Sequence, residues 1–211
     1  MPAPKSELAG ADVALLQHIN QFYTRSDTQK MRSDTLTEAE ISQLQTGDVL
    51  LRRGFGIVSE FIANYLGETY SITHCGMLVV SHPDSILVLH TQSDEGQNGI
   101  FYQPLPEFIR ESQYGTLAAV RLKVSNTQKM QMLAEFERLR RKGVRFDMGF
   151  NDADTTEMYC AELKKYVFKQ VMGVDILTDR ATRMGIDVIR MSNFFNPQHF
   201  EPLFNHLEPV K

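Results

Sequence analysis

The sequence predicts an α+β protein in which helices are grouped around a single antiparallel sheet. The first observation is a series of short, apolar, strand-like runs between residues 74 and 122, most of them separated only by brief polar turns. Consecutive strands with short connections pair antiparallel. The second observation is that amphipathic, helix-like segments precede and follow this series.

Composition places the chain among ordinary globular proteins. Of its 211 residues, 42% are hydrophobic and 23% are charged, which argues against a disordered chain. The length suits one domain with an extension, and we expect a helical extension over 1–35 and a main domain over 36–211. The net charge of −4 leaves no basic excess, so we expect no nucleic-acid partner. No apolar run approaches the roughly 18 residues of a membrane helix, so we expect no integral membrane segment.

The two cysteines, Cys75 and Cys160, are too few for a disulfide framework and do not require an oxidising compartment. The first residues of the chain contain no apolar signal core. We therefore expect a cytoplasmic protein from the chain as written, and a periplasmic or secreted one if a signal peptide has been removed. The sequence does not indicate the oligomeric state.

The N-terminal elements follow from apolar spacing and capping residues. An amphipathic helix is expected over 7–32, packed on the main domain, with a lid or a dimer contact as alternatives. A capping box formed by Thr37 and Glu40 predicts a short helix that ends near Leu44. A turn at 46–48 then leads into a strand over 49–53.

Further along, a helical stripe from Ile57 to Leu66 ends at Gly67. The spacing also predicts a long helix over Asn126–Lys142, closed by Gly143, and another over Tyr159–Val171. The tail contains helix-like pieces without a strong period. The strand-like runs between these helices are His74–Val80, Ile86–Thr91, Ile100–Gln103 and Leu117–Leu122.

Cys160 is the candidate nucleophile because it lies where a helix is expected to begin. Unpaired N–H groups and the positive end of the helix dipole favour a thiolate there, and the same N–H groups can stabilise an oxyanion. The alternative is that Cys160 is a small buried hydrophobic residue, which is the commoner fate of a lone cysteine.

His74 and His90 are candidates for a base and its orienting partner. Side chains alternate along a strand, so His74 and Cys75 point to opposite faces, and Cys75 faces the core if His74 faces a site. If the two runs form a hairpin, His74 and His90 lie near the same end of it. The alternative for each histidine alone is a hydrogen-bonded, half-buried strand residue.

A metal site is not expected. Zinc held by His74, Cys75, His90 and Cys160 would require the adjacent His74 and Cys75 to splay apart, and neither a CxxC nor an HExxH pattern is present. No phosphate-binding glycine loop is present either, so we expect no cofactor.

Four stretches resemble the permuted papain-like amidohydrolases, the YiiX group within the NlpC superfamily. The resemblance covers about residues 36–170, and the histidine precedes the cysteine, which is the reverse of the ordinary papain-like order. The stretches are Thr46–Gly54 (TGDVLLRRG), Ser71–Met77 (SITHCGM), Leu87–His90 (LVLH), and the pair Arg145–Phe150 (RFDMGF) and Tyr159–Leu163 (YCAEL).

The resemblance implies a circularly permuted papain-like fold and a catalytic triad. In it, Cys160 is the nucleophile, His74 is the general base, and His90 orients His74. Glu162 would support the start of the helix, and Asp48 would hold backbone in its turn. The chain departs from the family pattern at Cys75, after the histidine, and at Ala161, where the family usually has serine.

The activity implied is that of a thiol protease or amidase: hydrolysis of a peptide-like amide or an ester through an acyl-enzyme, on a small peptide-like or acylated substrate. One alternative is an acyltransferase of the lecithin retinol acyltransferase type acting on lipids. Another is a binding module, which predicts a buried Cys160 with an ordinary or raised pKa, whereas the enzyme predicts an exposed thiol with a lowered pKa. Tyr159, Tyr70 and Phe55 are candidate substrate contacts.

Overall fold

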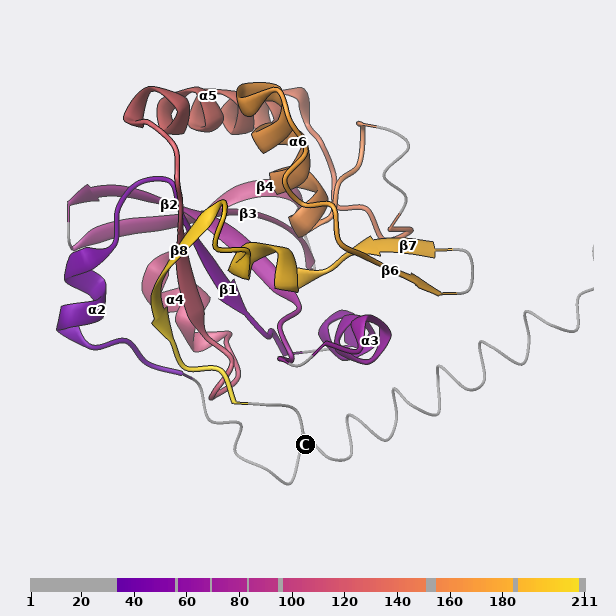
Figure 1. Cartoon of the computed structure of the whole chain (residues 1–211), viewed down its shortest axis with the longest axis horizontal. Coiled ribbons are helices and arrows are strands. Elements are labelled where there is room, and N and C mark those ends of the chain that lie inside the picture. Colours follow the sequence, from indigo (N-terminus) through magenta and orange to yellow (C-terminus); the bar gives the residue numbers. More distant parts are fainter. Residues whose placement is uncertain are drawn as a thin grey trace, which may run out of the picture.

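A six-stranded antiparallel sheet forms the centre of the structure, with the strand order β4-β3-β2-β1-β5-β8 (Figure 1). The structure is a computed structural model. It describes residues 34–55, 57–68, 70–82, 84–94, 97–150, 155–183 and 186–208. The helix expected over 7–32 lies outside the described residues. The strands are β1 (Asp48–Arg52), β2 (His74–His82), β3 (Ser85–Asp94), β4 (Gln97–Pro104), β5 (Ala118–Leu122) and β8 (Phe200–Asn205).

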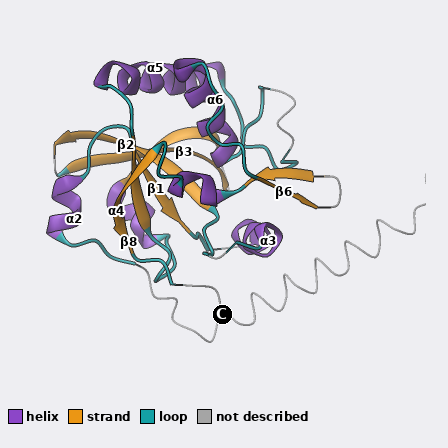
Figure 2. Ribbon diagram, viewed as in Figure 1, coloured by secondary structure: helices purple, strands orange, loops and turns teal. Residues whose placement is uncertain are grey.

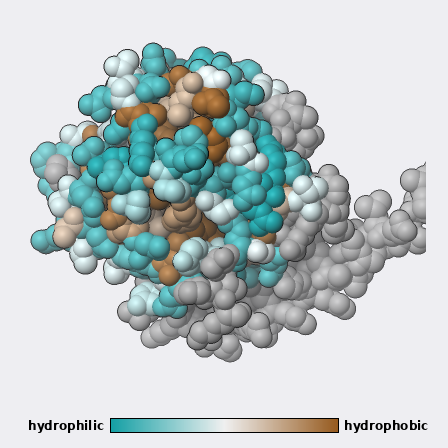
Figure 3. Space-filling view, in the orientation of Figure 1, coloured by the Kyte–Doolittle hydropathy of each residue, from teal (hydrophilic) through white to brown (hydrophobic). Residues whose placement is uncertain are grey.

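Helices cover both faces of this sheet, which confirms the α+β prediction (Figure 2). Helices α5 (Asn126–Lys142) and α6 (Cys160–Met172) pack on one face. Helix α4 (Leu105–Arg110) packs on the other, near the short α2 (Glu38–Gln43). Helix α3 (Ile57–Leu66) lies beside the sheet (Figure 1). On the side seen in Figure 3, hydrophilic residues cover most of the described surface. The helices of the described residues are all too short or too polar to span a membrane.

The predicted helix boundaries rest on local chemistry that the structure reproduces. Thr37 and Glu40 form the expected capping box, in which each side chain accepts a hydrogen bond from the other residue's backbone N–H. Helix α5 has the predicted bounds and ends at Gly143, which has a positive φ of 77°. Gly67, after α3, also has a positive φ, of 58°. Both conformations favour glycine, because a side chain would be strained there.

Five of the described elements were not predicted from the sequence. Helix α4 is only six residues long, too short for an apolar period to be visible. The tail, expected to contain helix-like pieces, instead forms a hairpin of β6 (Arg180–Arg183) and β7 (Ile186–Ile189), a 3-10 helix η1 (Met191–Phe195) and the edge strand β8. Strand β8 pairs with β5 and contains Pro202, which suits an edge position because proline donates no ladder hydrogen bond.

The sheet separates two apolar clusters, one on each of its faces. Cys75 and Met77 of β2 belong to the cluster under α5 and α6, whereas Leu78 belongs to the cluster under α4. The alternation that predicts Cys75 in the core is therefore confirmed. Asp48, at the start of β1, is fully buried and accepts hydrogen bonds from the backbone of Gln45 and from the guanidinium of Arg121 on β5.

Gly76 allows strands β2 and β3 to approach each other closely. A Cβ at this position would overlap Cγ1 of Val88 and would lie 3.5 Å from Cβ of His90 and 3.5 Å from the ring of Phe108. Substituting Gly76→Ala is therefore expected to lower the free energy of unfolding by about 1–3 kcal/mol, as overpacking does. Urea unfolding followed by circular dichroism measures this change. The double variant Gly76→Ala/Val88→Ala should recover part of the loss, and no recovery would contradict the proposed overlap.

Candidate active site

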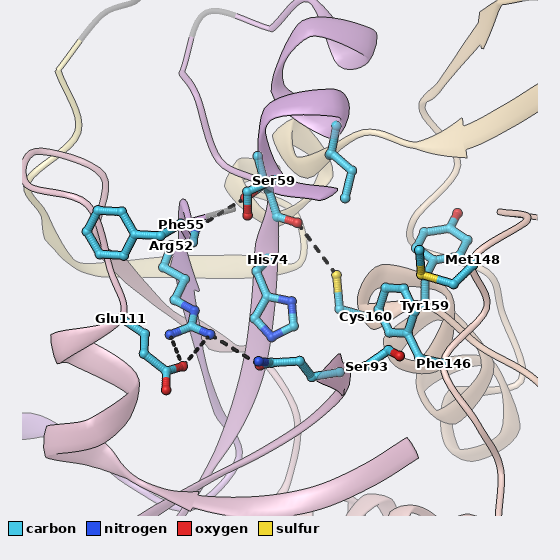
Figure 4. A pocket seen from close by; sticks show the side chains of 14 residues that line it. Arg52, Phe55, Ser59, His74, Ser93, Glu111, Phe146, Met148, Tyr159 and Cys160 are labelled. Carbon is cyan, nitrogen blue, oxygen red and sulfur yellow. Dashed lines mark hydrogen bonds and ion pairs between the residues drawn. The ribbon is translucent and has the colours of Figure 1, made fainter. Parts of the chain in front are cut away.

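A cavity of about 370 Å³ opens where the start of α6 meets the starts of β2 and α3 (Figure 4). One part of its lining is polar and another is apolar. Cys160 and His74 both face it. The polar residues of the lining include Arg52, Ser59, Thr73, Gln92, Ser93 and Glu111, and the apolar ones Phe55, Ile62, Phe146, Met148 and Tyr159.

Cys160 is the first residue of α6, as the sequence predicts. Glu162 accepts a hydrogen bond from the backbone N–H of Tyr159, at 3.3 Å, which gives it the predicted role in holding the helix start. The thiol of Cys160 donates to the carbonyl oxygen of Thr73, the residue directly before His74, at 3.9 Å. Cys160 is only 1% exposed, so the expectation of an exposed thiol is wrong, although the residue lines the cavity.

The surroundings of Cys160 lower the pKa of its thiol. The largest cause is a hydrogen bond from the side chain of Cys75; burial opposes it, and the charge of Lys164 and backbone N–H groups of Cys75 and Ala161 add to it. Burial raises the pKa of Cys75 well above its usual range, and its neighbour Cys160 raises it further. Of the two buried thiols, Cys160 is therefore the one that loses its proton more readily.

Lys164 is a buried cation one helical turn after Cys160. Its ammonium donates to the backbone carbonyls of Cys75 and Leu89, both at 3.4 Å, and lies 5.1 Å from the centre of the Phe136 ring. Burial lowers the pKa of this ammonium. Sequence reasoning missed Lys164; the available signal was a lysine four residues after the cysteine on the buried face of a helix.

His74 and His90 come together across the hairpin of β2 and β3, as the strand pattern predicts. Nε2 of His74 lies 2.9 Å from Nδ1 of His90, and the rings meet edge to face. Burial, followed by the positive charge of Arg52, lowers the pKa of both rings well below the usual value. Both imidazoles are therefore neutral near pH 7.

The three aromatic residues expected to contact substrate are divided between two cavities. Phe55 and Tyr159 line the cavity with Cys160, and the Tyr159 hydroxyl accepts a hydrogen bond from the backbone of Ile189. Tyr70 instead lines a separate cavity of about 330 Å³, where its ring packs near Phe195 of η1. The contact with η1 holds it there, so Tyr70 does not join the candidate active site.

A polar group beside the histidines was not predicted from the sequence. The guanidinium of Arg52 donates to Glu111 and Gln92 (Figure 4). It also donates to the carbonyl oxygen of Phe108 and stacks on the Phe108 ring at 3.9 Å. Glu111 also accepts a hydrogen bond from the side chain of Gln103. Arg52 ends a strand whose residues are all buried, and a charged residue at such a position was the signal for this group.

A cysteine at the first residue of a helix, packed on an antiparallel sheet and facing the same cavity as a strand histidine, defines the papain-like class of cysteine hydrolases, here with the histidine earlier in the chain. The chain belongs to the family described as permuted papain-like amidase enzymes, YaeF/YiiX, the C92 family, whose sequence profile matches residues 43–197. The family assignment confirms the resemblance and extends it into the tail.

A solved structure supports the same fold. The chain is similar to the protein described as metalloprotein YiiX from Escherichia coli O157:H7, with a TM-score of 0.62 and 17% identity over 79% of this chain and 99% of that one. A search of curated proteins found no match. In the part of the chain that the structure describes, no three His, Cys, Asp or Glu side chains are arranged to hold a metal ion.

Proposed function

We propose that this protein is a cysteine hydrolase that cleaves a peptide-like amide, or an ester, through an acyl-enzyme on Cys160 with His74 as its base. The observation that carries the proposal is that a thiol with a lowered pKa and a neutral imidazole face one cavity. A neutral imidazole is free to accept a proton at physiological pH. The family's description as amidases supports an amide substrate.

The chemistry assigns one proton to each step. Cys160 attacks the carbonyl carbon while its proton passes to His74, and backbone N–H groups at the start of α6 stabilise the oxyanion. His74 then gives that proton to the leaving amine or alcohol, which leaves an acyl group on Cys160. A water molecule, losing a proton to His74, attacks the acyl-enzyme, and the same proton returns to the departing thiolate.

His90 holds the ring of His74 in this proposal, because the 2.9 Å contact fixes one of its nitrogens. Phe55 and Tyr159 are proposed to contact the substrate, since both line the cavity. We propose residues 36–211 as the catalytic domain.

The burial of Cys160 favours a second candidate, a binding module that uses the same fold without catalysis. The two candidates differ in the pKa of the thiol, because a buried thiol without activating neighbours ionises only at high pH. Alkylation therefore distinguishes them.

We expect iodoacetamide to label wild-type protein at Cys160 with a midpoint below the pKa of about 8.5 of an ordinary thiol. Intact mass, read across a series of pH values, measures the labelled fraction, and Cys160→Ala controls for Cys75. The variant Lys164→Met keeps an unbranched side chain one atom shorter and removes its charge, so its midpoint should be higher than that of the wild type. Labelling only at high pH in both proteins would contradict the proposed hydrolase and support the binding module.

A further inference from the structure

We propose that Gln103 is a positioning residue that sets the tautomer of both histidines and so leaves Nδ1 of His74 free as the base. This inference rests on the proposed function, because it assigns a residue that prepares the base of that reaction. The relevant side chains lie on neighbouring strands and directly after α4, beside the cavity that holds Cys160.

Each of the two neutral imidazoles carries one proton, and only one of these two protons lies in the hydrogen bond between the rings. In one arrangement Nε2–H of His74 donates to Nδ1 of His90, His90 carries its own proton on Nε2, and Nδ1 of His74 is free. In the other, Nδ1–H of His90 donates to Nε2 of His74, and His74 carries its proton on Nδ1. Only the first arrangement leaves His74 able to accept a proton from Cys160.

The outer nitrogen of His90 decides between these arrangements, and Gln103 is placed to act on it. In the register of β3 and β4, His90 pairs with Phe101 and Val88 pairs with Gln103, so Gln103 lies diagonally across from His90 on the same face. Nε2 of His90 and Oε1 of Gln103 are both buried without a hydrogen-bond partner among the described residues. Each is what the other needs, since an amide oxygen accepts and an Nε2–H donates.

The orientation of the Gln103 amide is fixed from its other end. Nε2 of Gln103 donates to Oε1 of Glu111 at 3.0 Å, which leaves Oε1 of Gln103 for the histidine. Glu111 in turn accepts two hydrogen bonds from Arg52, both at 3.2 Å (Figure 4). Reversing the amide would place its carbonyl against a carboxylate and remove a hydrogen bond, so Gln103 presents an acceptor to His90.

The direction of every proton in this chain of contacts then follows. Because Gln103 offers an acceptor, His90 carries its proton on Nε2 and accepts at Nδ1. His74 therefore donates from Nε2 and is bare at Nδ1, as the reaction requires. The Gln103 side chain also favours the protonated form of His90, which is the effect of an acceptor on an imidazole, although burial still holds the pKa of that ring low.

The test compares two substitutions in the full-length protein, Gln103→Leu and Gln103→Glu. Leucine fills the space without an acceptor, whereas glutamate keeps an acceptor and loses the donor to Glu111. Nitrogen-15 NMR of the histidine rings separates the two tautomers, because protonated and bare ring nitrogens differ widely in chemical shift. We expect His74 and His90 to be Nε2–H tautomers in the wild type and in Gln103→Glu, and His90 to gain the Nδ1–H form in Gln103→Leu.

Hydrolysis of p-nitrophenyl acetate provides a second readout. We expect it to fall about tenfold in Gln103→Leu, the size of one buried hydrogen bond, and to recover at least partly in Gln103→Glu. A role in packing alone predicts the reverse, with leucine tolerated and the buried extra carboxylate harmful. Nε2–H tautomers that persist in Gln103→Leu would overturn the inference. The tautomers are measured without turnover, so an inactive wild-type protein would refute the proposed function and still test Gln103.

Discussion

Replacing His74 by alanine is expected to slow steady-state hydrolysis of p-nitrophenyl acetate by about a thousandfold and to leave an acetyl group on Cys160. Without the imidazole no base activates the water that resolves the acyl-enzyme. The first step should survive, because nitrophenolate leaves without an acid and the pKa of Cys160 is lowered by Cys75, Lys164 and backbone N–H groups. Absorbance follows turnover, and intact mass detects the acetylated protein.

The matched control for this variant is His82→Ala. His82 lies on the same strand, β2, but at its exposed end. This variant should hydrolyse the ester at the wild-type rate. Turnover by His74→Ala within about tenfold of the wild type would show that another group serves as the base, since general-base catalysis typically contributes more than that.

Replacing Phe108 by alanine is expected to lower the free energy of unfolding by about 3–5 kcal/mol, the usual effect of removing a buried phenyl ring. The ring is fully buried, stacks against the guanidinium of Arg52, and lies 5.8 Å from the ring of His74 and 5.4 Å from that of His90. We therefore expect ester hydrolysis to fall further than the loss of folded protein explains, because both histidines and Arg52 lose a packing surface. Guanidinium unfolding followed by circular dichroism measures the stability.

Phe194→Ala separates the two effects of that substitution. Phe194 is equally buried, but it packs against Phe200 in the part of the core formed by η1 and β8. A similar loss of stability is expected there, with normal activity per folded molecule. If both variants keep normal activity per folded molecule, the Phe108 ring has no part in positioning the histidines.

The reacting side chains were predictable because local rules place them. The cysteine was recognised from its place at the start of a helix. The two histidines were recognised from the alternation of side chains along two neighbouring strands, and the structure brings them together as the hairpin predicts. Helix α5 was equally predictable, since its capping residues, Ser125 and Gly143, lie in the chain beside it. In each case the information is contained within a few neighbouring residues.

The remaining parts depend on contacts that a single stretch of sequence does not contain. The role proposed for Gln103 depends on the register of β3 and β4 and on Glu111, which follows α4 and contacts the Gln103 amide. Lys164 of α6 meets the backbone carbonyls of Cys75 and Leu89 only because the helix packs on β2 and β3. Strand β8 forms by pairing with the edge of β5 that β1 does not occupy. Its own residues show no clear alternation that would predict a strand.

The order of the elements along the chain has a consequence for how this protein is synthesised. Both histidines, Gln103 and Arg52 lie on β1 to β4, Glu111 lies directly after α4, and all of them precede α6. Translation therefore completes the strands that carry both histidines and Gln103 before it reaches Cys160. Folding during synthesis begins with the N-terminal parts of a chain. The reactive sulfur is made after them, on a helix that docks against strands made earlier, and of the described elements only β6, β7, η1 and β8 follow it. The part of the chain made before α6 therefore contains the histidines without the nucleophile.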